Sequence, residues 1–187
     1  MLSDWGIELQ SKDLFSLAMS HYALKGYRYL TVPELVDKDV LLSTTTEEQV
    51  LWYTKTKGYV GSAEQSFLQL AKEGKLEKGK HQALTDCYRP LDQGLPLHYP
   101  RFKKLELIWW GSSLQENYLY VLCDAYDFFV SLTSEDKIKV VETEEGHDLE
   151  CNGIEIGSYG IRTFLNTNYI YGTGLALPRF TDTLNQE

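Results

Sequence analysis

The sequence predicts an α+β domain in which helices pack on a largely antiparallel β-sheet. Segments with helical spacing of apolar residues alternate with segments rich in aromatic and β-branched residues, and the last third of the chain alternates between strand-like runs and turns. Asn152-Gly153 lies between two extended runs, a strong indication of a two-residue hairpin. With 187 residues and no internal repeat, low-complexity tract or linker, the chain is expected to form a single domain over residues 1–187.

The first part of the chain is expected to form a helix, a strand and a second helix. Ser11 is suited to cap the first helix, and Gly26 follows its end. Aromatic and β-branched residues over 27–32 predict a strand, which Pro33 keeps from pairing further as a central strand. Residues 62–73 place apolar side chains on one stripe before a glycine, so they predict the second helix.

The rest of the chain is expected to supply most of the sheet and a long covering helix. The loop between its first two strands contains several prolines and is too long for a tight turn. The glycines near the C-terminus follow a short strand and precede a last segment expected to be helical. The predicted elements are strands over 81–89 and 103–110, a helix over 114–132, strands over 138–141, a hairpin within 149–156 and a strand over 169–171.

Composition excludes several classes of protein. Hydrophobic residues make up 43% of the chain and charged residues 24%, close to globular averages, which excludes a disordered, collagen-like or membrane-spanning protein. The start MLSDWGIELQ lacks the basic patch and apolar core of a signal sequence, so the protein is expected to be cytoplasmic. With 27 acidic against 18 basic residues, the net charge of −9 argues against non-specific binding to a polyanion.

Cysteines and the acidic cluster near residue 145 do not indicate a metal site. The three cysteines are widely spaced and form no CxxC pair, so they support neither a disulfide framework nor zinc, and each is expected to be a small buried thiol. The acidic patch is interpreted as a solvated turn, since its spacing matches no known ligand pattern. These residues are Cys87, Cys123 and Cys151, and, in the patch, Glu142, Glu144, Glu145 and His147.

Two adjacent strands carry side chains suited to a nucleotide. Arg89 follows one strand, where its guanidinium forms either a structural salt bridge or a fork for phosphate or carboxylate. On the next strand, alternation puts Phe102, Lys104 and Glu106 on one face. A phenyl ring beside charged groups is an unusual mixture for a core, and it could hold a planar base.

Two later segments add further polar groups. Glu155 and Ser158 follow the hairpin and supply the hard oxygen ligands that Mg²⁺ accepts beside substrate phosphates, with Arg162 as a fixed cation nearby. In Gly172-Thr173-Gly174 the glycines permit close backbone approach, and Arg179 is expected at a helix start.

In order and spacing, these segments resemble the three motifs of the class II aminoacyl-tRNA synthetases. Residues 26–33, which end in a proline, are similar to motif 1, which builds the dimer interface in that family. Arg89 and Phe102 match motif 2, where the arginine meets the α-phosphate and the phenyl ring stacks on adenine. Arg179 matches motif 3, where the arginine meets the γ-phosphate of a bent ATP. The resemblance implies the fold of a class II synthetase/biotin ligase-like core.

Other stretches resemble subgroups of that class. Ser62-Ala63-Glu64 is similar to the loop that receives the substrate amino group in seryl-type enzymes. The run from Asp148 to Arg162 is similar to the aspartyl and asparaginyl enzymes, where the residue matching Glu155 serves Mg²⁺ and ATP and the arginine holds a side-chain carboxylate or amide. The resemblance therefore implies ATP and Mg²⁺ as ligands, with Arg89, Phe102, Glu155, Ser158 and Arg179 around ATP, and Ser62, Glu64, Glu106 and Arg162 around the amino acid.

The chain also departs from the family pattern. The position two residues after Arg89, usually acidic in motif 2, is Leu91, with Asp92 next to it. The polar pocket of the seryl subgroup is missing, so serine specificity is not transferred. The chain starts at motif 1 and stops at motif 3, which leaves no room for a separate anticodon-binding domain, so a stand-alone catalytic domain is expected, as a homodimer through residues 26–33.

The function expected from the resemblance is ATP-dependent formation of an aminoacyl-adenylate, with Arg89 and Arg179 as catalytic residues. The expected acceptor is tRNA, which makes the chain a minimal aminoacyl-tRNA ligase-like protein, with a non-tRNA acceptor such as ammonia, an amine or a carrier protein as the alternative. A third possibility, which Leu91 favours, is a catalytically silent paralogue that acts as a regulatory or binding subunit.

Overall fold

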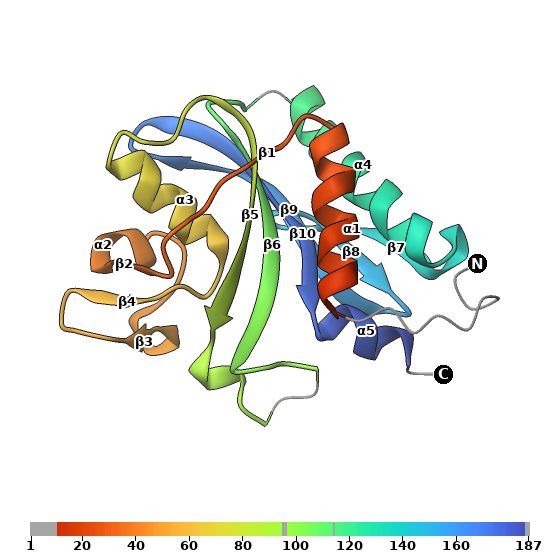
Figure 1. The fold of residues 1–187 in the computed structure, drawn as a ribbon, viewed down its shortest axis with the longest axis horizontal. Coiled ribbons are helices and arrows are strands. Elements are labelled where there is room, and N and C mark those ends of the chain that lie inside the picture. The colour runs from red at the N-terminus through yellow and green to blue at the C-terminus, as the bar shows by residue number, and fades with distance from the viewer. Residues whose placement is uncertain (1–10, 95–96, 114, 186–187) are drawn as a thin grey trace.

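The computed structural model describes residues 11–94, 97–113 and 115–185, and Figure 1 shows their arrangement. The start MLSDWGIELQ and the first residue of the predicted 114–132 helix lie outside these residues. In chain order the elements are α1 (Ser11–Leu24), β1 (Arg28–Tyr29), β2 (Leu35–Asp37), α2 (Lys38–Leu41), η2 (Glu47–Gln49), β3 (Leu51–Trp52), β4 (Lys57–Tyr59), α3 (Ala63–Lys72), β5 (Gly79–Tyr88), η3 (Pro90–Asp92), β6 (Arg101–Trp110), α4 (Gln115–Leu132), η4 (Glu135–Lys137), β7 (Ile138–Thr143), β8 (Gly146–Cys151), β9 (Ile154–Phe164), β10 (Thr167–Leu177) and α5 (Arg179–Leu184).

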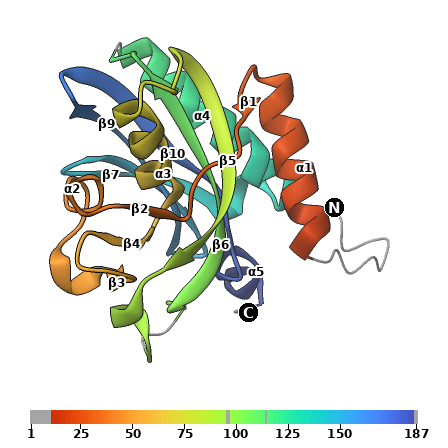
Figure 2. The ribbon, with the colours of Figure 1, turned by 60° about the vertical axis from the view of Figure 1, so that its left-hand side comes forward.

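A seven-stranded sheet in the order β1-β5-β6-β10-β9-β8-β7 forms the centre of the fold. Its strands pair antiparallel except β1, which pairs parallel with β5 at the sheet edge. The α+β class and the flanking helices predicted from the sequence are confirmed. A second sheet of three short strands, β2-β4-β3, lies to one side (Figure 2).

The central sheet separates two hydrophobic cores. Helices α1, α4 and α5 cover one face, and α2, α3 and the small sheet lie over the other (Figures 1 and 2). Neighbouring residues of a strand point to opposite faces, so Leu107 belongs to the first core and Ile108 to the second. On the α3 face, apolar packing occupies only one end of the sheet, and the polar residues of β6 lie at the other end.

Local sequence explains the best-predicted elements. Ser62 caps α3 by accepting a hydrogen bond from the backbone N–H of Glu64 at 3.2 Å, and Gly74 follows the helix end with φ +68°. Asn152 and Gly153 both have positive φ, 52° and 78°, which is the geometry of a tight β8–β9 turn. The predicted helix over 62–73 and the hairpin are confirmed.

Three expectations are wrong in extent or in kind. The strand expected over 27–32 is only β1, because the chain leaves the sheet edge after Leu30 donates its N–H to Gln82 O. The strand expected over 169–171 extends to Leu177. It contains the glycines, which were expected to lie after the strand, and aromatic rings of the core pack against them. Cys123 is exposed on α4, whereas Cys87 and Cys151 are buried as expected.

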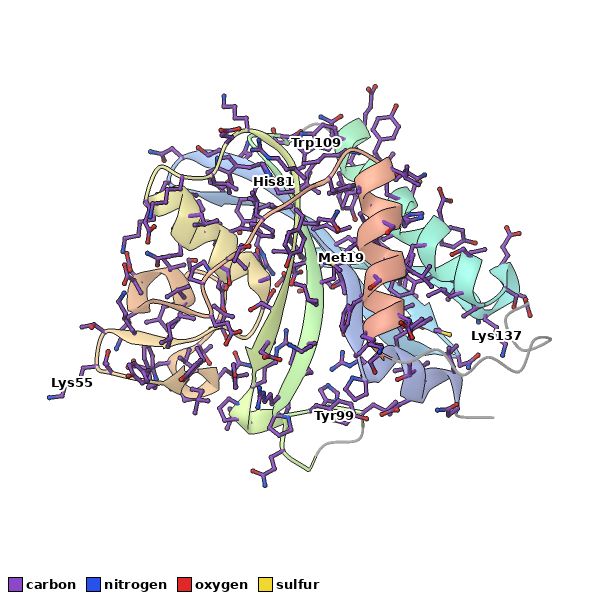
Figure 3. The ribbon with its side chains drawn as sticks, viewed as in Figure 1. Met19, Lys55, His81, Tyr99, Trp109 and Lys137 are labelled. Carbon is purple, nitrogen blue, oxygen red and sulfur yellow. The ribbon has the colours of Figure 1, made fainter. Side chains whose placement is uncertain are left out.

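The structure also contains elements that were not expected. Residues 34–61 hold α2, η2 and the small sheet, whose strands of two or three residues are too short to leave a periodic pattern. Lys55 extends from the outer end of this sheet (Figure 3). Among the described residues, no helix has both the length and the apolar character needed to cross a membrane.

Candidate active site

Two adjoining cavities lie over the polar end of the sheet. The larger has a volume of about 340 Å³ and the smaller about 40 Å³, and Arg89, Lys104, Glu155 and Thr173 line both. Strands β5, β6, β10 and β9 are consecutive in the sheet, so they bring together residues more than 70 positions apart. Every candidate site residue named from the sequence lines one or both cavities: Ser62, Glu64, Arg89, Phe102, Glu106, Glu155, Ser158, Arg162 and Arg179.

Alternation along β6 places its three candidate side chains in this region. Phe102 lines the smaller cavity, Glu106 the larger and Lys104 both, as expected for residues two positions apart on one face. Lys104 Nζ lies 3.0 Å from Glu106 Oε1, and Ser62 donates its hydroxyl to Glu106 Oε2 at 2.5 Å. Glu106 is only 1% exposed, so these two partners compensate a buried charge.

Glu64 lies buried in the first turn of α3. Its carboxylate oxygens accept hydrogen bonds from Arg162 Nη1 at 3.0 and 2.9 Å, and Oε1 also accepts one from the Tyr169 hydroxyl at 2.8 Å. Burial raises the pKa of this carboxyl above its usual value, although the nearby guanidinium opposes the rise. The residues named separately for the amino group and the side chain of a substrate are therefore partners of each other.

Arg162 has a second carboxylate partner, in the β7–β8 turn. Its Nη2 donates to Glu145 Oε2, and its guanidinium lies 4.2 Å from the centroid of the Tyr171 ring. Burial disfavours the charged guanidinium, but Glu64 and Glu145 outweigh this effect and raise the pKa of Arg162. The acidic turn expected to be only solvated thus reaches the site through Glu145.

Arg89 connects the two cavities. Its Nε donates to Gly61 O at 3.1 Å, and its guanidinium lies 5.2 Å from the centroid of the Phe102 ring. Within the described ranges, no carboxylate forms an ion pair with Arg89, so this cation is available to an anion. Of the two interpretations left open for Arg89, the described residues show no salt bridge, so the anion fork stays a prediction.

Arg179 begins α5, as expected, at the far side of the smaller cavity. Its Nε donates to Leu97 O at 3.1 Å, and Nη1 lies 3.6 Å from Glu155 Oε1. The Tyr99 hydroxyl donates to Asp182 of α5, which holds the loop before β6 against this helix, and Figure 3 labels Tyr99 there. Tyr99 and Arg179 both line the smaller cavity beside Phe102.

Glu155 and Ser158 lie three residues apart on β9 and nevertheless both line the larger cavity. The β8–β9 register shifts between Leu149 and Glu150, which breaks simple alternation at this point. The described residues contain no group of three His, Cys, Asp or Glu side chains arranged to hold a metal ion. Two oxygen ligands from the protein would fit Mg²⁺ only where substrate phosphates and water complete the coordination of the ion.

Part of the larger cavity was not expected from the sequence. Thr44, Thr45 and Gln49 line it from the segment between α2 and β3, where no element was predicted. The Thr46–Gln49 capping box of η2 was the available sequence signal for this turn. Leu91 and Asp92 also line this cavity, so the acidic residue beside the atypical leucine faces the same space.

Comparison with known proteins identifies the class of fold. No protein-family model and no curated protein matches the sequence. The chain has the fold of the class II aminoacyl-tRNA synthetase catalytic domain. Two solved structures of pyrrolysyl-tRNA synthetase from Desulfitobacterium hafniense, one of them of PylSc, superpose with TM-scores of 0.75 and 0.74 at 17% and 18% identity. Each alignment covers 92% of this chain, which spans 66% and 68% of the two structures, about two thirds of their length.

Proposed function

We propose that this chain activates an amino acid with ATP, forming an aminoacyl-adenylate and releasing pyrophosphate. One observation carries the proposal: nine residues selected from five separate sequence segments all line two adjoining cavities on one face of the sheet. The fold shared with class II synthetase structures supports it. A set of buried and half-buried charges gathered in one cavity is costly unless it serves a ligand.

The reaction needs alignment rather than a protein nucleophile. A substrate carboxylate oxygen forms a bond to the α-phosphorus of ATP, and the bond from that phosphorus to the bridging oxygen breaks, so the electron pair leaves with pyrophosphate. Arg89 supports this step best, because its guanidinium lies between the cavities and has no carboxylate partner among the described residues. Its fixed charge would stabilise the negative charge that grows on the α-phosphate.

Phe102 and Arg179 are proposed to bind the base and the end of the triphosphate. The space beside Phe102, about 40 Å³, is too small for a purine while Arg89 lies over the ring. Attraction of Arg89 to the α-phosphate would withdraw it from the ring and make room for the base. Arg179 would exchange its 3.6 Å contact with Glu155 for a phosphate oxygen.

Glu155 and Ser158 would hold Mg²⁺ together with the ATP phosphates, where the ion would neutralise phosphate charge. Glu155 is half-exposed to the cavity, and Asp148 interacts with the Ser158 hydroxyl, which orients this oxygen. Release of Glu155 from Arg179 on ATP binding would free its carboxylate for the ion. Glu64 would take the ammonium group of the amino acid, with Ser62, Glu106 and Arg162 completing the surroundings.

Amino-acid-dependent exchange of labelled pyrophosphate into ATP tests the proposal. The purified chain is assayed with each standard amino acid, and we expect exchange with at least one. Arg89→Ala should lower that exchange by about 10²- to 10³-fold, corresponding to about 2.7–4 kcal/mol of transition-state stabilisation. Lys103→Ala is the control, because this half-exposed cation pairs with Asp86 and lines neither cavity. Exchange unaltered by Arg89→Ala would contradict the proposal.

The acceptor of the adenylate is proposed to be tRNA, with ammonia, an amine or a carrier protein as the alternative. The net charge of −9 weighs against tRNA, whereas the shared fold weighs for it. Charging of bulk tRNA by the active chain separates the two.

A homodimer through residues 26–33 is proposed as well, since β1 forms an open sheet edge with both residues exposed.

One observation favours a regulatory subunit without turnover. Leu91 lines the larger cavity and is 59% exposed, where an acidic side chain would be expected for contact with adenine. Measurable ATP binding without exchange for any amino acid would select this alternative. Asp92 on the same lining opposes it.

A further inference from the structure

At the end of the larger cavity that is proposed to bind the amino acid, negative groups outnumber positive groups. They surround a single cation. Arg162 donates hydrogen bonds from Nη1 to both carboxylate oxygens of Glu64 and from Nη2 to the carboxylate of Glu145. Glu64 is 5% exposed and lines the cavity, so its carboxylate faces a ligand while remaining screened from bulk water. One guanidinium between two carboxylates leaves one negative charge uncompensated.

The position of Glu145 is built into the strands beneath it. A Cβ at position 160 would lie 2.5 Å from the Glu145 backbone oxygen, so Gly160 is required for the turn to approach β9 this closely. The Tyr171 hydroxyl donates to Glu145 Oε2 at 3.4 Å, and the same ring supports the Arg162 guanidinium. Although 67% of the Glu145 side chain is exposed, its carboxylate has two partners in the site.

The other cations of the cavities are already engaged or assigned. Lys104 lies 3.0 Å from Glu106, and Arg179 lies 3.6 Å from Glu155. Arg89 is the cation that the proposed reaction needs at the α-phosphate. A carboxylate on the substrate side chain would thus enter beside Arg162 as a third negative group around one positive group.

We infer that this site takes an amino acid with an uncharged side chain, and that Glu145 is a specificity-determining residue that excludes acidic ones. The inference rests on the proposed function. The ammonium group of the substrate balances the charge of the Glu64–Arg162–Glu145 cluster, and no free cation among the described lining residues is left for a second carboxylate. The resemblance left a carboxylate or an amide open as the partner of Arg162, and the geometry points to the uncharged alternative. The hydroxyl and amide groups of Thr44, Thr45 and Gln49 on the lining agree with it.

The test compares amino-acid-dependent pyrophosphate exchange for the full chain and two variants. Glu145→Gln keeps the size and hydrogen-bonding capacity of the side chain and removes its charge. Glu144→Gln makes the same change one residue away, on an exposed side chain of the same turn. Each is assayed with aspartate, glutamate and the uncharged and basic standard amino acids, and the measured quantity is the exchange rate with an acidic amino acid relative to the best uncharged one.

The unaltered chain should show highest exchange with an uncharged amino acid. Glu145→Gln should raise the relative rate with aspartate or glutamate about tenfold, and Glu144→Gln should leave it as it was. Highest exchange with an acidic or basic amino acid would overturn the inference while leaving the proposed function intact. A relative rate unmoved by Glu145→Gln would also overturn the role of Glu145. Absence of exchange with every amino acid would remove both the inference and the proposed function.

Discussion

Ser62 at the N-terminus of α3 donates a 2.5 Å hydrogen bond to Glu106 on β6, 44 residues further along the chain. The same hydroxyl oxygen accepts the backbone N–H of Glu64, so one side chain caps the helix and fixes its end to the central sheet. This contact sets the distance between Glu64 and the strands that carry the other candidate residues. Its consequence for stability is open to direct measurement.

Ser62→Ala should lower the free energy of unfolding by about 2 kcal/mol. The substitution removes a helix cap. It also removes one of the two partners of the buried Glu106 carboxylate, the hydroxyl that donates to Oε2. Ser62→Thr keeps the hydroxyl and should cost less than half as much. Urea denaturation of the three proteins measures the difference, and equal losses for the two variants would show that the hydroxyl has no special role.

Gly172→Ala should destabilise the protein by about 2 kcal/mol, because the new methyl group overpacks the core. Its Cβ would lie 2.6 Å from Cδ1 of Tyr159, whose ring is fully buried and whose hydroxyl is fixed on Thr173 O at 2.6 Å. Gly174→Ala is the matched comparison, with its closest atom, Cε2 of Tyr22, at 3.0 Å. Thermal unfolding should place Gly174→Ala between Gly172→Ala and the unaltered chain, and the reverse order would contradict the packing argument.

The three thiols should differ sharply in reactivity. Cys123 is exposed on α4, whereas burial raises the pKa of Cys87 to about 12 and also raises that of Cys151. A thiol reagent at neutral pH should therefore modify one cysteine rapidly in the native protein and all three in denaturant. Cys123→Ser should abolish the rapid phase. A rapid phase that survives this substitution would mean that a core opens more readily than its packing indicates.

Glu64 should make stability fall as pH rises above its ordinary pKa of 4.5. Burial raises the pKa of the folded-state carboxyl, so between 4.5 and the folded value the native protein binds more protons than the unfolded chain, and the free energy of unfolding decreases with increasing pH. Glu64→Gln should make this slope less negative. Chemical denaturation at a series of pH values measures it.

Glu73→Gln provides the control for that series, since its effect should have the opposite sign and a lower pH range. A hydrogen bond from Lys75 lowers the pKa of Glu73, so its contribution to stability is present above 4.5 and is lost as pH falls. This variant should leave the slope above 4.5 unchanged. If stability has the same pH slope in Glu64→Gln and in the unaltered chain, the conclusion that burial raises the pKa of Glu64 is contradicted.

Local sequence predicted helices α3 and α4, the β8–β9 turn and the residues that line the two cavities. The cap at Ser62, the turn at Asn152-Gly153 and the alternation along β6 depend on neighbours within a few residues, so the order of amino acids is enough to predict them. The small sheet could not be predicted in this way, because strands of two or three residues are stabilised by pairing with distant partners and carry no period of their own.

The sequence by itself determined an α+β chain with an arginine, a phenyl ring and paired acidic and basic residues at defined strand positions. Only the tertiary structure decided that Glu64 pairs with Arg162, that Glu145 from an exposed turn joins them, and that the glycines of β10 receive the rings of Tyr159 and Tyr22. The physical reason is that an ion pair or a ring contact depends on where separate strands cross, and residues 98 positions apart in the chain meet only when the sheet has formed.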